Sequence, residues 1–488
     1  MLHNRDIKCL GFAGFAVMVA VALPARAQDT LTLARAVAMA RTANPRVAGA
    51  SAEVAAAGAR IRPAGTLPDP TLTIGAMNYM LPSLSASRDP LSMNQVTLTQ
   101  MLPVNGALGL RRTVARFDSV RVASQRDALM LSAERGVRAR YWDLYHTDRA
   151  LEIMDRTLAV VRELSNVATT MYTVGSTVQS DVVRAQVAVT RMQQEIIEMR
   201  LQRFAAASAF NALLGRPGEA PLVLPAPPGH EGHGAATLPL ETPPLPPFDS
   251  LVALADTGNP DIAAGRAGVE GARTNETAIR RMIYPDLDLG MAYGQRVGDN
   301  DMLSLMVGVS VPVFARSRQF RMRDEARAMR NASEEMLRAM RLEVRSMLAT
   351  AYQEAETARR QVALYAGSLN PQAVAAYEAA LSAYRVGRVD FPTVLDAQMA
   401  LLTYQHDLHR YEAMYGTAVA EIDRLIGRPG AVRSGSSWTE PPVRNDRWLY
   451  GVESGAATRR PTSRWGSRAL DLIGARRRRL EPGYGREA

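Results

Sequence analysis

The chain repeats one sequence pattern in its two halves, and this duplication limits the folds that it can adopt. The motif Leu-Leu-Gly-Arg-Pro-Gly at residues 213–218 returns as Leu-Ile-Gly-Arg-Pro-Gly at residues 425–430. The motif Tyr-Thr-Val-Gly at residues 172–175 returns as Tyr-Arg-Val-Gly at residues 384–387, with the same offset of 212 residues. Because further matches follow in the same order, each half must fold into the same series of elements.

The duplication divides the chain into segments. It predicts two structural repeats, at residues 28–220 and 251–430, joined by a Pro-rich linker or equatorial segment at residues 221–250. Residues 431–488 form a basic tail rich in Gly, Ser and Pro, which we expect to be disordered.

Residues 1–27 have the features of a secretory signal peptide. Arg5 and Lys8 precede an apolar run, and Ala25-Arg26-Ala27 supplies a cleavage site. The single cysteine of the chain, Cys9, lies in this segment. The mature protein would therefore be exported without disulfides and without a lipid-bearing cysteine.

Each repeat has the same predicted order of elements. A helix, at about residues 45–61 or 260–282, precedes two short strands, and these lead into a very long helix, a turn and a returning helix. In the second repeat the strands show clear alternation of apolar residues with mostly small or polar ones. The expected strands cover about residues 71–79, 95–101, 287–293 and 303–311.

The long helix of the first repeat is expected at residues 107–172, where no proline occurs. It has an apolar residue at every seventh position from Met130 to Leu158, as in a coiled coil. At 1.5 Å per residue it would span roughly 100 Å. Its counterpart at residues 316–384 is interrupted near Gly367 and Pro371, where we expect a kink.

Composition excludes several classes of function. The formal net charge is +10, but residues 431–488 hold 12 arginines against 6 acidic residues, so the remainder is close to neutral and nucleic acid is not an expected partner. The sequence contains no phosphate-binding loop, no nucleophile motif G-x-S-x-G and no C-x-x-C pair. We therefore expect no enzyme activity and no cofactor.

The four expected strands also indicate an oligomer. After residue 27 no apolar run is long enough for a membrane-spanning helix, so a bilayer would have to be entered by strands. Four strands cannot close on themselves, and an open edge in lipid leaves costly unpaired backbone groups. Several copies that join their strands and long helices would enclose a tunnel.

The chain resembles the TolC family of outer-membrane efflux proteins over about residues 31–430. The resemblance rests on Leu31-Thr32-Leu33 through Asn44-Pro45, on Pro68-Asp69-Pro70, on the paired Tyr-x-Val-Gly turns and on residues 394–398, Val-Leu-Asp-Ala-Gln. It implies an α+β membrane protein, mainly long α-helical coiled hairpins that form a periplasmic α-barrel. Four β-strands per chain would contribute to a 12-stranded outer-membrane β-barrel in a homotrimer.

The resemblance also implies the function and the partners. The trimer would be the passive exit duct of a tripartite efflux system in the outer membrane, surrounded by outer-membrane lipid. A periplasmic adaptor, also called a membrane fusion protein, would connect it to an inner-membrane transporter, and that transporter would be proton-driven. The cargo would be heavy-metal cations or drugs.

The same resemblance assigns roles to the two turns and the residues after them. The turns would be adaptor-docking tips, formed by Val174, Gly175 and Ser176 and by Val386, Gly387 and Arg388. Asp396 would form a ring of like charges at the periplasmic entrance, with Asp181 at a similar distance past the first turn. Arg388 and Asp390 would form links between helices that keep the entrance shut. A simpler interpretation of these residues and of Asp396 is that they are solvated charges near helix starts.

Other interpretations of the sequence stay open. His406 and His409 share a helix face but lack a third ligand, so we expect surface residues and no metal site. Methionines near the strands could conduct copper or silver, although packing explains them more simply. The chain could instead be a non-conducting exported coiled-coil scaffold of the envelope, or the exit duct of a type I protein secretion system. The methionines concerned are Met77, Met80, Met93, Met101, Met302 and Met306.

Overall fold

The computed structural model describes residues 31–81, 89–223 and 242–428. The predicted signal peptide and basic tail lie outside the described residues, as does the middle of the Pro-rich segment, and the predicted boundaries of the repeats stay predictions. No helix in the described ranges combines the length and the apolar content needed to cross a bilayer.

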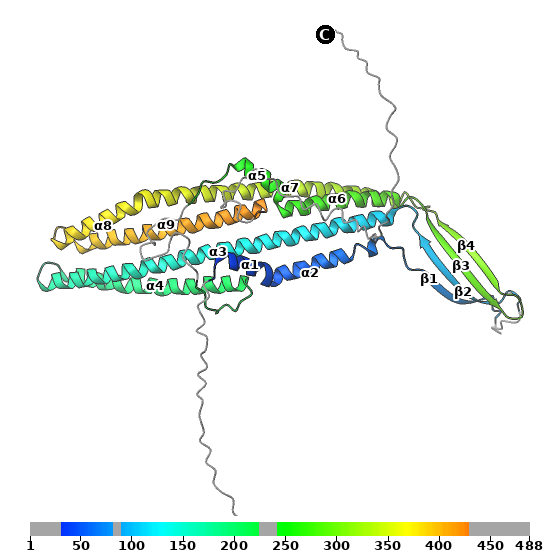
Figure 1. Cartoon of the computed structure of the whole chain (residues 1–488), viewed down its shortest axis with the longest axis horizontal. Helices are drawn as coiled ribbons and strands as arrows, with labels where there is room; N and C mark the ends of the chain where they lie inside the picture. The colour runs from blue at the N-terminus through cyan, green and yellow to red at the C-terminus, as the bar shows by residue number, and fades with distance from the viewer. Residues whose placement is uncertain (1–30, 82–88, 224–241, 429–488) are drawn as a thin grey trace, which may run out of the picture. The chain divides into compact units, whose positions relative to one another are not determined.

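The same order of elements occurs twice along the chain (Figure 1). The first half contains α1 (Leu33–Ala43), α2 (Pro45–Ala59), the 3₁₀ turn η1 (Pro63–Gly65), β1 (Thr71–Met77), β2 (Met93–Leu102), α3 (Ala107–Thr173) and α4 (Gln179–Leu213). The second half contains α5 (Phe248–Gly258), α6 (Pro260–Arg281), β3 (Asp286–Arg296), β4 (Met302–Ser310), α7 (Gln319–Leu364), the π-helical turn η3 (Tyr365–Leu369), α8 (Asn370–Arg385) and α9 (Phe391–Ile426).

The repeated Asn-Pro pairs start equivalent helices. The Asn44 side chain caps α2 by accepting a hydrogen bond from the Arg46 backbone amide, and Asn259 caps α6 in the same way from Asp261 and Ile262. Each cap is followed by a proline at the start of the helix, where a backbone donor is not needed. The short helices α1 and α5, which lie just before these pairs, were not anticipated from the sequence.

The four strands form one antiparallel sheet in the order β1-β2-β3-β4, so the two repeats meet where β2 pairs with β3. Residues that lie directly opposite one another on neighbouring strands point to the same face of the sheet. One row of opposed residues across all four strands consists of Ile74, Val96, Tyr293 and Leu303. The predicted alternation is confirmed, because this face is mainly apolar, whereas the other carries mainly small and polar residues together with methionines. On that other face Met93 packs over Gly294, where an added Cβ would lie 2.6 Å from the Met93 sulfur.

The long helices pack side by side, and α3 contacts α4, α6 and α9 (Figure 1). The heptad positions from Met130 to Leu158 are buried or half-buried, as the pattern predicts. The predicted interruption near Gly367 and Pro371 is the π-helical turn η3, after which α8 begins with Pro371 in its first turn. A π turn inserts one extra residue into the helix, which rotates the side chains that follow it about the helix axis. The helix therefore continues from α7 into α8 without a break.

The closest approach of α3 and α9 depends on a glycine. A Cβ added to Gly416 would lie 2.1 Å from Cε2 of Trp142, so the indole ring occupies the space of a missing side chain. Trp142 and Tyr145 pack edge to face beside it, with ring centroids 5.5 Å apart. This contact joins the first repeat to the second.

Gly416→Ala should therefore destabilise the protein by about 1–3 kcal/mol, because the indole must move in a packed core. Chemical unfolding of the purified protein measures the change. Gly49→Ala in α2 is the control, because nothing lies within 4 Å of the added Cβ, and it should stabilise the protein by about 0.5–1 kcal/mol. Equal effects of the two substitutions would contradict the packing described for Trp142.

Candidate functional site: the two helix-hairpin turns and the adjoining groove

The two turns that end α3 and α8 have the same backbone geometry. In the first, the amide of Ser176 donates to the carbonyl of Met171 at 2.8 Å, and that of Gly175 donates to Tyr172 at 3.0 Å. In the second, Arg388 donates to Ala383 and Gly387 to Tyr384, both at 2.9 Å. This pair of bonds is the Schellman motif, which satisfies the last carbonyls of a helix.

Each motif requires a residue with positive φ, and glycine supplies it. Gly175 has φ of 75° and Gly387 has φ of 69°, and nothing lies within 4 Å of a Cβ added to either. Val174 and Val386, which precede them, are both exposed. The turns therefore present a small apolar surface whose shape depends on backbone conformation and not on packing within the chain.

The surroundings of the two turns differ. Tyr172 is 45% exposed, whereas its counterpart Tyr384 is 2% exposed and packs against Phe391 with ring centroids 6.0 Å apart. Tyr384 belongs to a buried cluster that also includes Leu164 of α3 and Ala185 of α4. This cluster holds the ends of both hairpins together, so the turns of the two repeats are positioned by one core.

Asp181 lies in the first turn of α4 and is buried. Its Oδ2 accepts a hydrogen bond of 2.6 Å from the hydroxyl of Thr177. Burial, and then the charge of Asp181, raise the pKa of the Tyr384 hydroxyl above its ordinary value. Asp181 is thus part of the core between the hairpins, and its carboxylate does not face solvent in the single chain.

Asp390 caps the start of α9. Its carboxylate accepts hydrogen bonds from the hydroxyl and the backbone amide of Thr393, and these lower the pKa of Asp390, with a smaller contribution from Arg184. Arg388 is exposed and forms no ion pair with any described residue. Within one chain, therefore, Arg388 and Asp390 are not linked to each other by an ion pair.

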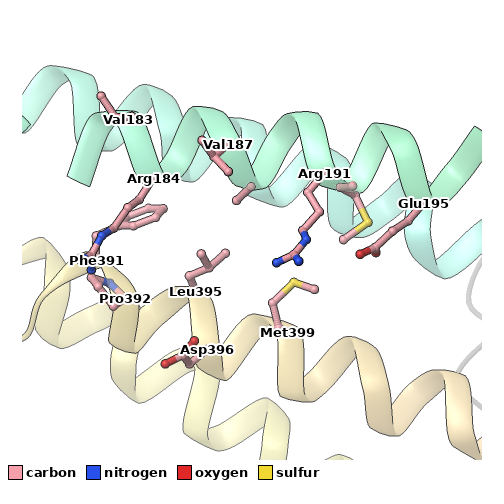
Figure 2. Close-up of a pocket in the computed structure, with 12 residues that line it drawn as sticks. Val183, Arg184, Val187, Arg191, Glu195, Phe391, Pro392, Leu395, Asp396 and Met399 are labelled. Carbon is pink, nitrogen blue, oxygen red and sulfur yellow. The ribbon is translucent and has the colours of Figure 1, made fainter. Parts of the chain in front are cut away.

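Asp396 is exposed and lines a groove of about 430 Å³ between α4 and α9. Figure 2 shows Arg184 and Arg191 extending from α4 toward α9 across this groove. Glu195 lies farther along α4, so the groove carries two basic and two acidic side chains. The three α4 residues were missed from the sequence, because only the packing of α4 near α9 brings them beside Asp396.

A second polar group lies between α3 and α9, around His409. The Glu412 carboxylate lies 2.7 Å from His409 Nδ1 and accepts a hydrogen bond of 2.7 Å from the hydroxyl of Tyr145. His409 and Glu412 are buried, so the expectation of a surface position is wrong for His409. The helix face that carries it packs against α3, which the sequence of α9 alone does not reveal.

His146 joins this group from α3, opposite His406, with ring centroids 4.7 Å apart. Its Nε2 is buried and has no hydrogen-bond partner. Burial, and then the neighbouring His406, lower the pKa of His146 to about 4. In the described part of the chain no group of three or more His, Cys, Asp or Glu residues is arranged to hold a metal ion.

The low pKa of His146 predicts a dependence of stability on pH. Above pH 6.5, the ordinary histidine value, His146 is neutral in both states and contributes no pH dependence. As the pH falls from 6.5 to about 4, the unfolded chain binds a proton there that the folded chain does not, so the free energy of unfolding should fall by up to about 3 kcal/mol.

The measurement is chemical unfolding across that pH range for the wild type and for His146→Gln, which cannot titrate. The wild type should lose more stability than the variant. Parallel curves for the two proteins would show that His146 titrates equally in the folded and unfolded states.

Comparison with known proteins agrees with this architecture. The family model for the outer membrane efflux protein matches residues 36–216 and 251–428. The chain belongs to the outer membrane efflux protein family. The resemblance seen in the sequence is thereby confirmed, and members of this family are outer-membrane efflux channels with a helical part in the periplasm that catalyse no reaction.

Individual members of the family are distant in sequence. The cobalt-zinc-cadmium resistance protein CzcC of Cupriavidus metallidurans is 23% identical over 415 residues, which cover 83% of this chain and 92% of CzcC. A solved structure of CusC has a TM-score of 0.68 at 16% identity, covering 81% of this chain and 92% of CusC. VceC of Vibrio cholerae has a TM-score of 0.67 at 15% identity, covering 81% and 96%. The mainly helical fold with four strands is that of these efflux channels.

Efflux channels of this family act as trimers with a periplasmic adaptor and an inner-membrane pump.

Proposed function

We propose that three copies of this chain enclose one continuous duct, through which an inner-membrane pump expels its cargo across the outer membrane. The observation that carries this proposal is an open, four-stranded sheet with one apolar face, continuous in the same chain with helices of up to 67 residues. Three such sheets joined edge to edge would make a 12-stranded barrel with its apolar faces toward lipid. The helices would then line the periplasmic part of the duct.

The exposed faces of the helices support this assembly. Apolar side chains on α4 are exposed in the single chain, at spacings that place them along one side of the helix. An apolar stripe of this kind is typical of a surface that a neighbouring subunit covers. The stripe comprises Val183, Val187, Ile197, Leu201 and Phe204, which are more than half exposed.

The turns at the ends of α3 and α8 would be the surfaces that contact the adaptor. Their support is the exposure of Val174 and Val386 on a backbone fixed by two hydrogen bonds per turn. The entrance would lie beside them, with Asp396 facing the duct. Arg388 and Asp390 would link neighbouring copies in the closed state, since they are not paired with each other within one chain. The pump that drives transport would use the proton gradient.

Heavy-metal cations are the cargo that the relatives favour. CzcC, named for resistance to cobalt, zinc and cadmium, aligns with most of the chain. An acidic ring at the entrance would raise the local concentration of such cations. Drugs as cargo, and secreted proteins as cargo of a type I system, are the competing outcomes of an export assay with the cognate pump.

Asp396→Asn should weaken block of the channel by divalent cations roughly tenfold, because the trimer loses three like charges around its axis. Single-channel currents of purified trimers in planar bilayers, with and without a divalent cation, measure this. Asp249→Asn is the control, since Asp249 is also an exposed acid near the start of a helix, α5. Unchanged block would remove Asp396 from the entrance, and the absence of any pore in the wild type would favour the scaffold.

Gly175→Val and Gly387→Val should abolish export while trimers and pore conductance remain. Each forces a β-branched residue into positive φ, at a cost of about 1–2 kcal/mol, and would distort the turn that contacts the adaptor. Gly298→Val is the matched control, because Gly298 has φ of 86° and equally open surroundings but lies in the turn between β3 and β4.

Growth of cells on cobalt, zinc or cadmium salts, with the cognate pump and adaptor present, measures export. The control should resist these salts like the wild type. Export that persists in the two turn variants would contradict the docking role.

A further inference from the structure

All four strands connect to the helices at the same end of the sheet. β1 and β3 begin there, and β2 and β4 end there, as their antiparallel register requires. Four segments of the chain therefore meet at this junction between strands and helices (Figure 1). They are residues 60–70, 103–116, 280–286 and 311–323.

These four segments are strongly basic. Together they contain eleven arginines and two aspartates, Asp69 and Asp286. All eleven arginines are exposed. At 1.5 Å per residue, those inside α3 and α7 lie within about 15 Å of the start of their helix. We call this group the arginine collar: Arg60, Arg62, Arg111, Arg112, Arg116, Arg280, Arg281, Arg316, Arg318, Arg321 and Arg323.

Most of the collar has no acidic partner in the described chain. Arg60 pairs with Asp118, Arg280 with Glu276, and Arg321 and Arg323 with Asp324. The other seven form no ion pair with any described residue, although elsewhere on the helices arginines pair repeatedly with acids three or four positions away. A group of unpaired like charges attracts anions to that part of the surface.

Exposed apolar side chains lie among these arginines. Val313 is 79% exposed and Phe314 is 77% exposed, directly after β4, and Tyr284 is exposed just before β3. Val104 is exposed after β2, and Leu67 before β1. Aromatic and aliphatic side chains next to basic ones are typical of the boundary between hydrocarbon and headgroups. The collar thus borders the apolar face of the sheet at its periplasmic end.

We propose that the arginine collar binds the headgroups of anionic phospholipids in the periplasmic leaflet of the outer membrane. The guanidinium groups would hold lipid phosphates by paired hydrogen bonds, while Val313, Phe314 and Tyr284 lie among the upper acyl chains. This fixes the height of the sheet in the bilayer and orients the helices below it. The inference rests on the proposed channel, whose strands are placed in the outer membrane.

The test compares trimers in vesicles of phosphatidylcholine with trimers in vesicles of equal parts phosphatidylcholine and phosphatidylglycerol. Native mass spectrometry measures the retained phosphatidylglycerol, and thermal unfolding measures the stability of the inserted trimer. In the double variant Arg316→Gln, Arg318→Gln, the apparent affinity for phosphatidylglycerol should fall roughly thirtyfold. The wild type should unfold at a higher temperature when the anionic lipid is present, and the variant should gain less.

The matched control is the double variant Arg46→Gln, Arg345→Gln. Both arginines are exposed and form no ion pair in the described chain, but they lie on α2 and α7 far from the strands. This control removes the same charge and should retain phosphatidylglycerol like the wild type. Equal losses in both double variants would show general electrostatic attraction and would overturn the collar as a site.

The remaining outcomes separate this inference from the proposed channel. Trimers that insert and conduct equally in both lipids, and that retain no phosphatidylglycerol, overturn the collar and leave the channel intact. A protein that inserts in neither vesicle overturns both. Inorganic phosphate or glycerol phosphate that reproduces the stabilisation without anionic lipid would indicate a soluble anion and would overturn the assignment to the membrane.

Discussion

The open edges of the sheet are the constraint on which the rest of the structure depends. In the described chain β1 and β4 each pair with a single neighbour, so each presents a row of backbone groups without a partner strand. In hydrocarbon each unpaired group would cost several kcal/mol, and pairing of the β4 edge of one copy with the β1 edge of the next would remove that cost. Since α3 follows β2 and α7 follows β4, copies that joined their strands would also bring their helices close together.

Duplication gives the two hairpins turns of the same backbone geometry. The charged residues beside the two turns differ in burial and in hydrogen bonding. In the first repeat Asp181 is buried and accepts a hydrogen bond from Thr177 of the same turn, so its carboxylate stabilises that turn. In the second, Arg388 and Asp396 are exposed and form no ion pair in the described chain. Since Arg184 and Arg191 of the first repeat line the same groove as Asp396, both repeats would contribute charge near the proposed entrance.

Local patterns in the sequence were sufficient for the strands and the long helices, but not for the short helices α1 and α5 or for the contacts between elements. The absence of proline and the sevenfold period predicted a helix at residues 107–172, and α3 spans Ala107–Thr173. The positions of His146 against His406 and of Trp142 against Gly416 depend on which faces of α3 and α9 meet, and these helices are more than 200 residues apart in sequence. The burial of Asp181 was missed for the same reason, because an acid in a first helical turn is equally stable in water.

The distribution of arginine differs between the two ends of the molecule. In the helical region many arginines pair with acids, often within one helical turn, so these pairs add little net charge. The solubility of the helices therefore does not require the excess at the strand–helix junction. Because screening limits an exposed charge to about 10 Å, that excess acts locally and does not reach tips at the far end of α3. Attachment to the membrane through the proposed collar and the proposed selection at the entrance would thus be electrostatically independent, and either could change without disturbing the other.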